Sequence, residues 1–332
     1  MIRQKGMALV LVLWVLSLLT IMAGSFALSM RRESAIIAGI KNNAQASAVA
    51  KSGIAMAEMM LLNADPAKGW RADGSIYEIN ATDAKIRVRL LSETGKIDIN
   101  KADESLLKSL ITNASLDEEQ QTRLVSAILD WRDEDDLVHI EGAEKQEYQD
   151  AGLSYQPRNK PFQSIEELQL VLGMNKSLFL WIEPLITVYS GQQQVTMQVA
   201  AKEVLQVIPG LDKSLVDSYI AARRESVINN LPAPPFPSSS GMNAPTGQNI
   251  TVGQSSNSAG QNNVLTVVSE AILNDESSSS ISAVIKKSNN TQTPSPFEAL
   301  KWQHVTANSA SLFTDAMSEL LVKQYAEPEL NN

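Results

Sequence analysis

Cysteine is absent from this 332-residue sequence, histidine occurs only twice, and aromatic residues make up 5% of the chain. The lack of cysteine excludes disulfides and thiol chemistry. The scarcity of aromatic residues indicates a core that relies on aliphatic packing. Acidic residues outnumber basic residues by 37 to 28, and the net charge of −9 argues against nucleic-acid binding, because phosphates need a basic surface.

The common catalytic motifs are missing as well. The chain has no G-x-S-x-G elbow, no Walker A loop and no H-E-x-x-H pair, and its two histidines are His139 and His304. We therefore predict that the protein is not an enzyme. The enzymatic alternative, a membrane-anchored hydrolase that uses the acidic cluster described below, lacks a histidine or lysine of evident role.

One long apolar run stands near the N-terminus. No charged residue occurs in Met7–Met30, whereas Arg3 and Lys5 precede this run and Arg31 follows it. With a rise of ~1.5 Å per residue, a helix over these residues is ~36 Å long and can cross a ~30 Å hydrocarbon core. The basic leader predicts a single-pass membrane protein with a cytoplasmic N-terminus.

Three interpretations of this run are open. It is a secretory signal peptide cut near Ser25–Ala27, an uncleaved membrane anchor, or an anchor behind a short cleaved leader. The junction Lys5-Gly6-Met7 favours the third, because it resembles the leader of type IV pilins and secretion pseudopilins. The resemblance implies that a prepilin peptidase cuts after Gly6, removes residues 1–6 and leaves Met7 as the N-terminus, which is then methylated.

The apolar helix is predicted to continue beyond the membrane. No proline occurs between Arg31 and Leu62, and Pro66 is expected to end the helix. One helix over residues 7–65, half in lipid and half packed on a domain, resembles a pilin stem and argues against cleavage near residue 27. An apolar stripe is indicated by residues at three- and four-residue steps, namely Ile36, Ile37, Ile40, Ala44, Ala48, Ile54, Ala55, Met59 and Leu62.

The stem departs from most pilins at one position. Pilin-like subunits usually have a glutamate five residues after the cleavage site, and its carboxylate is thought to pair with the N-terminal amine of a neighbouring subunit. A buried carboxylate is tolerated only when it is paired in this way. Here the position is occupied by Leu11. A subunit without the acid fits best at the end of a filament.

Segments of alternating polar and apolar residues follow the stem and predict strands from both ends of the chain. They are Ser75–Asn80, Lys85–Leu90, Leu265–Leu273, Ser280–Lys286 and Phe297–Trp302. The expected fold is α+β: a long N-terminal transmembrane stem helix, an antiparallel pilin-like sheet and a large, mainly α-helical inserted domain. The parts are a leader (1–6), the stem (7–65), the first strands (66–93), the insertion (94–225), a flexible polar loop (226–263), the returning strands (264–303) and a C-terminal tail (304–332).

One segment of the insertion, Ile208–Ile220, resembles the helix-hairpin-helix modules of DNA-binding proteins. Gly210 matches the first glycine of these modules, but Asp212 stands where a second glycine lets backbone amides approach a phosphate. We expect the segment to be a protein-docking scaffold. The alternative function is a membrane-anchored DNA-uptake protein or receptor with degenerate modules of this kind.

The insertion also contains a dense acidic stretch, with nine acidic and two basic residues between Ser126 and Asp150. Its simplest interpretation is a solvated loop. Acids at the C-terminal end of a helix nevertheless repel one another and the helix dipole, and a divalent cation relieves this. Oxygen ligands with only His139 nearby favour a structural Ca²⁺ over zinc or copper. The predicted ligands are Asp130, Asp133, Asp135, Asp136 and Glu144, with Glu141 and Glu147 in reserve.

A set of segments in a specific order resembles the K-type minor pseudopilins of type II secretion systems. These segments are Asp130–Asp135, Glu141–Glu144 with Tyr148, Tyr155–Phe162, Ser164–Leu168 and Gly173-Met174. The missing glutamate at Leu11 is characteristic of the same family. The resemblance spans the chain from Met1 to about Trp302 and implies a pilin-like fold that carries a calcium-binding helical insertion.

The resemblance also implies a function. It is that of a non-enzymatic minor pseudopilin that caps or initiates the tip of the periplasmic pseudopilus and so helps to export folded proteins. The implied partners are the I-type and J-type minor pseudopilins, prepilin peptidase and the inner membrane. The secretin and exported proteins are further candidates, nucleic acid is not expected, and the head is expected in the periplasm.

Overall fold

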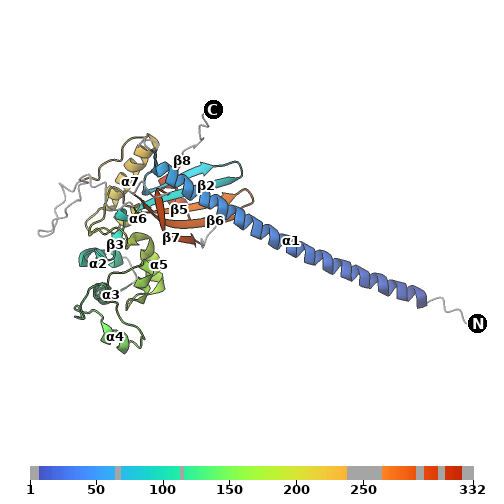
Figure 1. The fold of residues 1–332 in the computed structure, drawn as a ribbon, viewed down its shortest axis with the longest axis horizontal. Coiled ribbons are helices and arrows are strands. Elements are labelled where there is room, and N and C mark those ends of the chain that lie inside the picture. The colour runs from blue at the N-terminus through green and yellow to red at the C-terminus, as the bar shows by residue number, and fades with distance from the viewer. Residues whose placement is uncertain are drawn as a thin grey trace, which may run out of the picture.

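The computed structural model describes residues 7–63, 69–112, 116–237, 264–288, 295–305 and 311–323. Helix α1 (Met7–Leu61) extends far beyond a globular head, which lies around its C-terminal end (Figure 1). Gly6 and the rest of the predicted leader lie outside the described residues, as does most of the predicted polar loop at residues 226–263. The expected α+β fold is confirmed: a long apolar helix, a mainly antiparallel sheet and a helical insertion are all present.

No described residue covers the first half of α1. Every residue from Ala8 to Lys41 is exposed, including the large apolar side chains of the predicted membrane segment. This half reaches a mean hydropathy of 2.4, so α1 is long and apolar enough to cross a membrane. Such a surface is stable only in lipid or against another apolar partner, which suggests that α1 anchors the protein in a membrane.

The second half of α1 lies across the sheet, but with a different face from the predicted one. Of the predicted stripe only Ile54 is buried, whereas Ile40, Met59 and Leu62 are exposed. The buried face is made of small residues with Ile54, at Ala46, Ala50, Gly53, Ile54 and Ala57. Small residues let the helix axis approach the sheet closely, so size and not hydrophobicity alone selects the packed face. The larger apolar residues remain available on the opposite side.

Gly53 is the point of closest approach. A Cβ atom placed there would lie 2.2 Å from Ser269 Oγ and 2.9 Å from Ile86 Cγ2. We expect Gly53→Ala to destabilise the head by about 1–3 kcal/mol through overpacking, as measured by urea unfolding. Gly39→Ala is the matched control, because no atom lies within 4 Å of its added methyl group. Equal stabilities of the two variants would contradict this packing.

The head contains a six-stranded sheet in the order β7-β6-β5-β2-β1-β8. Its strands are β1 (Asp73–Asn80), β2 (Ala84–Ser92), β5 (Val264–Leu273), β6 (Ser278–Lys287), β7 (Phe297–Val305) and β8 (Leu321–Lys323). The first five pair antiparallel, with Val88 opposite Ser269 and Val268 opposite Ser282. The two sequence-distant halves thus form one sheet, as predicted.

The C-terminal tail differs from the predicted antiparallel sheet. Strand β8 pairs in parallel with β1, so the sheet is not wholly antiparallel. The preceding 3₁₀ helix η4 (Asp315–Leu320) buries Leu320, and Phe313 is also buried. The tail, to which no role was assigned, therefore completes one edge of the sheet. A strand of three residues carries too little alternation to be recognised from its sequence.

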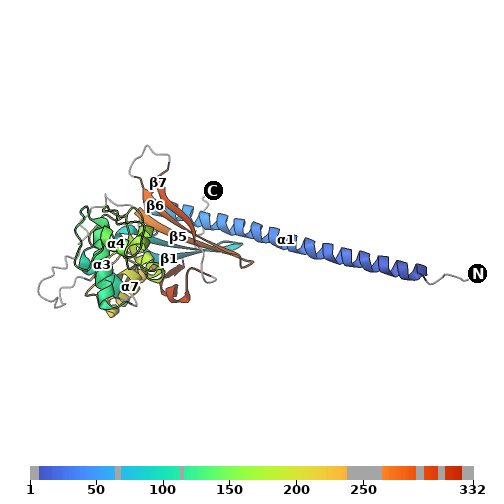
Figure 2. The same ribbon diagram turned by 90° about the horizontal axis from the view of Figure 1, so that it is seen from below.

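The insertion covers one end of the sheet and the face opposite α1 (Figure 2). Its described helices are α2 (Glu104–Thr112), α3 (Glu118–Arg132), α4 (Lys145–Asp150), α5 (Lys176–Ile182), α6 (Lys202–Leu205) and α7 (Lys213–Ile228). Its 3₁₀ helices are η1 (Glu93–Gly95), η2 (Ile165–Leu170) and η3 (Glu183–Leu185). Two short parallel strands, β3 (Ile97–Asp98) and β4 (Ile186–Thr187), tie the beginning of the insertion to its middle.

A buried arginine joins the insertion to the sheet. Arg223 of α7 is 2% exposed, and its guanidinium donates to the carbonyl oxygens of Ala200 (2.8 Å) and Asp73 (2.5 Å). Its Nε lies 3.5 Å from Oδ2 of Asp73, the first residue of β1, which is also 2% exposed. The pair fixes α7 on the start of the sheet.

Candidate metal centre

The acidic cluster is built on the C-terminal end of α3. The helix starts in a capping box, in which the Asp117 side chain accepts from the backbone N–H of Gln120 and the Gln120 side chain accepts from that of Asp117. Fifteen residues later it ends with Asp130 in its last turn and Asp133 as its C-cap. Two carboxylates therefore face the negative end of the helix dipole, which is an unfavourable place for them unless a cation is near.

Asp130 holds the following loop in place. Its side chain is fully buried and accepts from the backbone N–H groups of His139 (3.1 Å) and Ala143 (2.6 Å). It also contacts Nδ1 of the His139 ring. Residue 142 must be glycine, because a Cβ atom there would lie 2.0 Å from Asp130 Oδ2. The chain between α3 and α4 is thus wrapped around one carboxylate.

Two buried carboxylate oxygens of the cluster have no hydrogen-bond partner among the described residues, Oδ1 of Asp133 and Oε1 of Glu144. Burial raises the pKa of Glu144 to about 7, and the nearby charges of Asp130, Asp133 and Asp136 add to the effect. The pKa of Asp133 is raised by burial first and then by Asp135 and Asp130. These carboxylates lie close enough to repel one another and are under-satisfied, which is an environment that a cation would complete.

The other predicted ligands have local partners. Asp135 accepts from the backbone N–H of Leu137 at 2.9 Å, and Asp136 accepts from the amide of Asn159 at 2.8 Å. The two reserve ligands, Glu141 and Glu147, have other partners. Glu141 forms an ion pair with Arg123 at 2.9 Å, and Glu147 accepts from the backbone N–H of Glu144 at 2.9 Å as part of the α4 capping box.

Sequence reasoning missed two members of this site. One side-chain ligand atom from each of Asp130, Asp133 and His139 lies within 4.8 Å of the others. His139 had been noted only as the lone histidine nearby, because calcium prefers oxygen. Asn159 comes from a loop 23 residues after Asp136 and has no local signal. Only the fold brings it to the cluster.

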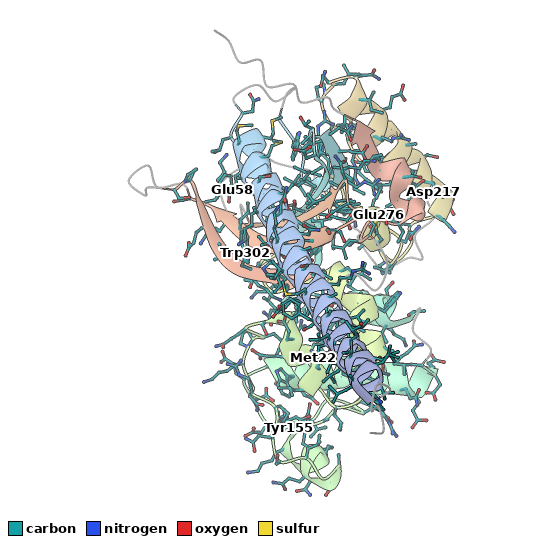
Figure 3. The ribbon with its side chains drawn as sticks, turned by 90° about the vertical axis from the view of Figure 1, so that its right-hand side faces the viewer. Met22, Glu58, Tyr155, Asp217, Glu276 and Trp302 are labelled. Carbon is teal, nitrogen blue, oxygen red and sulfur yellow. The ribbon has the colours of Figure 1, made fainter. Side chains whose placement is uncertain are left out.

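Several buried aromatic residues lie next to the acidic stretch, within a core whose described residues are otherwise mainly aliphatic. Trp131, Tyr148 and Phe162 are all buried, and the Trp131 ring stacks on Phe162 at 6.1 Å between centroids. Tyr155 meets Tyr148 edge-on at 5.8 Å. Figure 3 shows Tyr155 in the lobe of the head that is farthest from the sheet. Buried apolar side chains next to Asp130 and Glu144 in the chain fit the burial that raises the pKa of Glu144.

The segment that resembles a helix-hairpin-helix, Ile208–Ile220, follows α6 and includes the first half of α7. Asp212 is the residue before α7, and its carboxylate accepts from the hydroxyl of Ser214. It therefore places a negative charge at the helix N-terminus where a phosphate would otherwise bind. Asp217 adds another acidic side chain on α7 (Figure 3).

The chain is similar to proteins of one secretion system. Residues 84–191 match the model of the family "Type II secretion system (T2SS), protein K". Type II secretion system protein K of Klebsiella pneumoniae is 25% identical over 218 residues, which cover 59% of this chain and 65% of the relative. The protein of the same name from Aeromonas hydrophila is 26% identical over 215 residues, covering 55% and 63%. The chain thus spans just under two thirds of the length of these relatives.

A solved structure is similar as well. It is a chain of the GspK–GspI–GspJ complex from the type 2 secretion system of enterotoxigenic Escherichia coli, with a TM-score of 0.47 and 16% sequence identity. The match covers 84% of this chain and 99% of the other. The family match and the two relatives of the same name give no support to the DNA-uptake alternative.

Proposed function

We propose that this chain, whose residues 84–191 match the family of type II secretion system protein K, is a minor pseudopilin of the pseudopilus. In this role it caps or initiates the periplasmic filament that drives export of folded proteins across the outer membrane. The role is mechanical and requires no turnover, so we infer that the protein is not an enzyme.

This proposal rests mainly on the two different halves of α1. One continuous helix is exposed and apolar over Ala8–Met30 and packs on the sheet from Ala46 onward. A membrane anchor alone has no need of a rigid continuation into its head. A filament subunit needs it, because stems that leave the membrane must pack side by side while the heads stay fixed to them. The exposed Ile36, Ile37 and Ile40 supply apolar surface for that packing.

Leu11 supports a place at the tip. Its exposed aliphatic side chain offers no carboxylate to the N-terminal amine of a neighbouring subunit. The stem must then join its partners by apolar helix packing. We infer that these partners are the I-type and J-type minor pseudopilins, that the anchor lies in the inner membrane with its N-terminus in the cytoplasm, and that the head lies in the periplasm, where it can meet the secretin or exported proteins.

We further propose that the acidic cluster holds a structural Ca²⁺. The unpartnered oxygens of Asp133 and Glu144 fit a hard cation that takes 6–8 oxygen ligands. Asp130, Asp135 and Asp136 would complete the set with backbone carbonyls. The ion would neutralise repulsion at the end of α3 and so fix the loop to α4.

Processing is tested by the intact mass of the protein recovered from inner membranes. We expect the loss of residues 1–6 and a methyl group on the amine of Met7. A Gly6→Val variant is the control, because a branched side chain at the cut site should block the prepilin peptidase and leave the full-length mass. Loss of about 27 residues would indicate an ordinary signal peptide, and an uncut wild-type chain would indicate a plain anchor; either outcome contradicts the proposal.

A further inference from the structure

A cavity of about 310 Å³ lies between the sheet and the insertion. Its floor is the sheet face opposite α1: Val268 and Val284 line it, whereas their neighbours Val267 and Ala283 belong to the core beneath α1. The insertion and the tail contribute further apolar walls, including Ile165, Ile186, Leu312, Phe313 and Met317. The cavity is therefore separate from both the stem packing and the acidic cluster.

Strand β7 forms one side of this cavity and is also an edge of the sheet. Lys301, Gln303 and Val305 line the cavity at alternate positions. β7 pairs with β6 on one side, and no described strand pairs with its outer side. Trp302 points to the other face and lies beside α1 in Figure 3; it is 44% exposed. An unpaired edge of nine residues is a template for a further strand.

The acidic side chains that line the cavity have partners, with one exception. Lys96 pairs with Glu93 at 2.6 Å, and Lys301 pairs with Glu166. Glu93 also accepts from the hydroxyls of Thr187 and Thr266, so it is fully satisfied.

Glu183 differs from these acids. Its half-buried carboxylate has no ion pair or hydrogen bond among the described residues. Burial raises its pKa and Glu166 adds to the rise, and the nearby charges of Lys301 and Lys96 oppose this only in part. A ligand that brings a cation to this point gains a charge pair at a site that is partly shielded from water.

We propose that this cavity and the free edge of β7 together form a docking site for an extended strand of a partner protein, which carries apolar side chains and a lysine or arginine on the same face. The strand adds to β7 through backbone hydrogen bonds. Its apolar side chains enter the cavity, and its basic residue pairs with Glu183. The cavity lies on the side of the sheet away from α1, between the sheet and the insertion, so we infer that its occupant is a partner other than a stem.

The test uses the full-length protein in detergent micelles and a fluorescein-labelled heptapeptide, read by fluorescence anisotropy. The peptide has threonine at odd positions and leucine, lysine and leucine at even positions, so that the last three share one face of a strand. We expect saturable binding that is about fivefold weaker in Glu183→Gln, the size of one modest charge pair. Ser282→Phe, which fills the cavity from β6, should weaken it by more than about tenfold.

Matched controls separate these contributions. Glu225→Gln removes the same charge from the exposed side of α7 and should bind as the wild type does. A peptide with glutamate in place of lysine should bind more weakly and be insensitive to Glu183→Gln. A peptide with a methylated backbone cannot pair with β7 and should not bind. The site is wrong if no peptide binds, if the methylated peptide binds equally, or if a Ser282→Phe protein with an unchanged melting temperature retains full affinity.

Discussion

Chelation of calcium is expected to lower the melting temperature of the full-length protein by about 5–10 °C, if the ion is present at ~100 times its dissociation constant. The physical reason is that binding to the folded state alone adds stability, about 2.7 kcal/mol at that concentration. Without the ion, the buried oxygens of Asp133 and Glu144 are left unpartnered beside other carboxylates. The measurement is thermal unfolding with calcium and with a chelator.

Substitution of Glu144 should separate the two effects of its charge. Glu144→Gln removes a ligand charge, so the calcium-dependent rise in melting temperature should shrink by more than half. It also removes repulsion with Asp130 and Asp133, so the calcium-free protein should melt at a higher temperature than the calcium-free wild type. Glu134→Gln is the control, because Glu134 is exposed in the same stretch and is not a predicted ligand. Identical melting curves with and without chelator in the wild type would rule out the calcium site.

Loss of the Arg223 side chain is expected to cause a second large change, a fall in the free energy of unfolding. Arg223→Met should destabilise the head by about 3–5 kcal/mol, because it leaves the buried carboxylate of Asp73 without its positive partner. It also removes donors from the carbonyl oxygens of Ala200 and Asp73. Urea unfolding of the full-length protein measures the change.

Two further variants test that explanation. Arg224→Met alters the neighbouring half-buried residue and should cost about 0.5 kcal/mol or less. In the double variant Arg223→Met with Asp73→Asn, the orphaned charge is gone while Oδ1 can still accept from Ser75. The double variant should therefore be more stable than Arg223→Met alone. If the double variant loses as much stability as the two single variants together, the two side chains act independently and the explanation fails.

The site was predictable in part. The acids at the end of α3 follow one another in the sequence, so Asp130, Asp133, Asp135 and Asp136 were identified by local density alone. Glu144 lies at the start of α4, near enough to Asp130, Asp133 and Asp136 to feel their charges, and its role as a ligand stays a prediction. The separate use of Glu141 and Glu147 was not predictable, since it depends on where Arg123 and the α4 capping box lie.

The sequence by itself determined the elements whose signal is local. The uncharged run predicted the apolar helix, the absence of proline predicted its continuation through Leu61, and alternation predicted five of the six strands of the large sheet. Local patterns suffice there, because backbone hydrogen bonding and side-chain periodicity act over a few residues.

Only the tertiary structure decided which surfaces meet. The small residues around Gly53, and not the larger apolar ones, form the contact of α1 with the sheet, because a helix packs most closely where side chains are short. The tertiary structure brought Asn159 to Asp136, Arg223 to Asp73 and the tail to the edge of β1. It also left Glu183 without a partner among the described residues, beside an open cavity. Each of these depends on contacts between residues far apart in the chain, for which a single sequence contains no local signal.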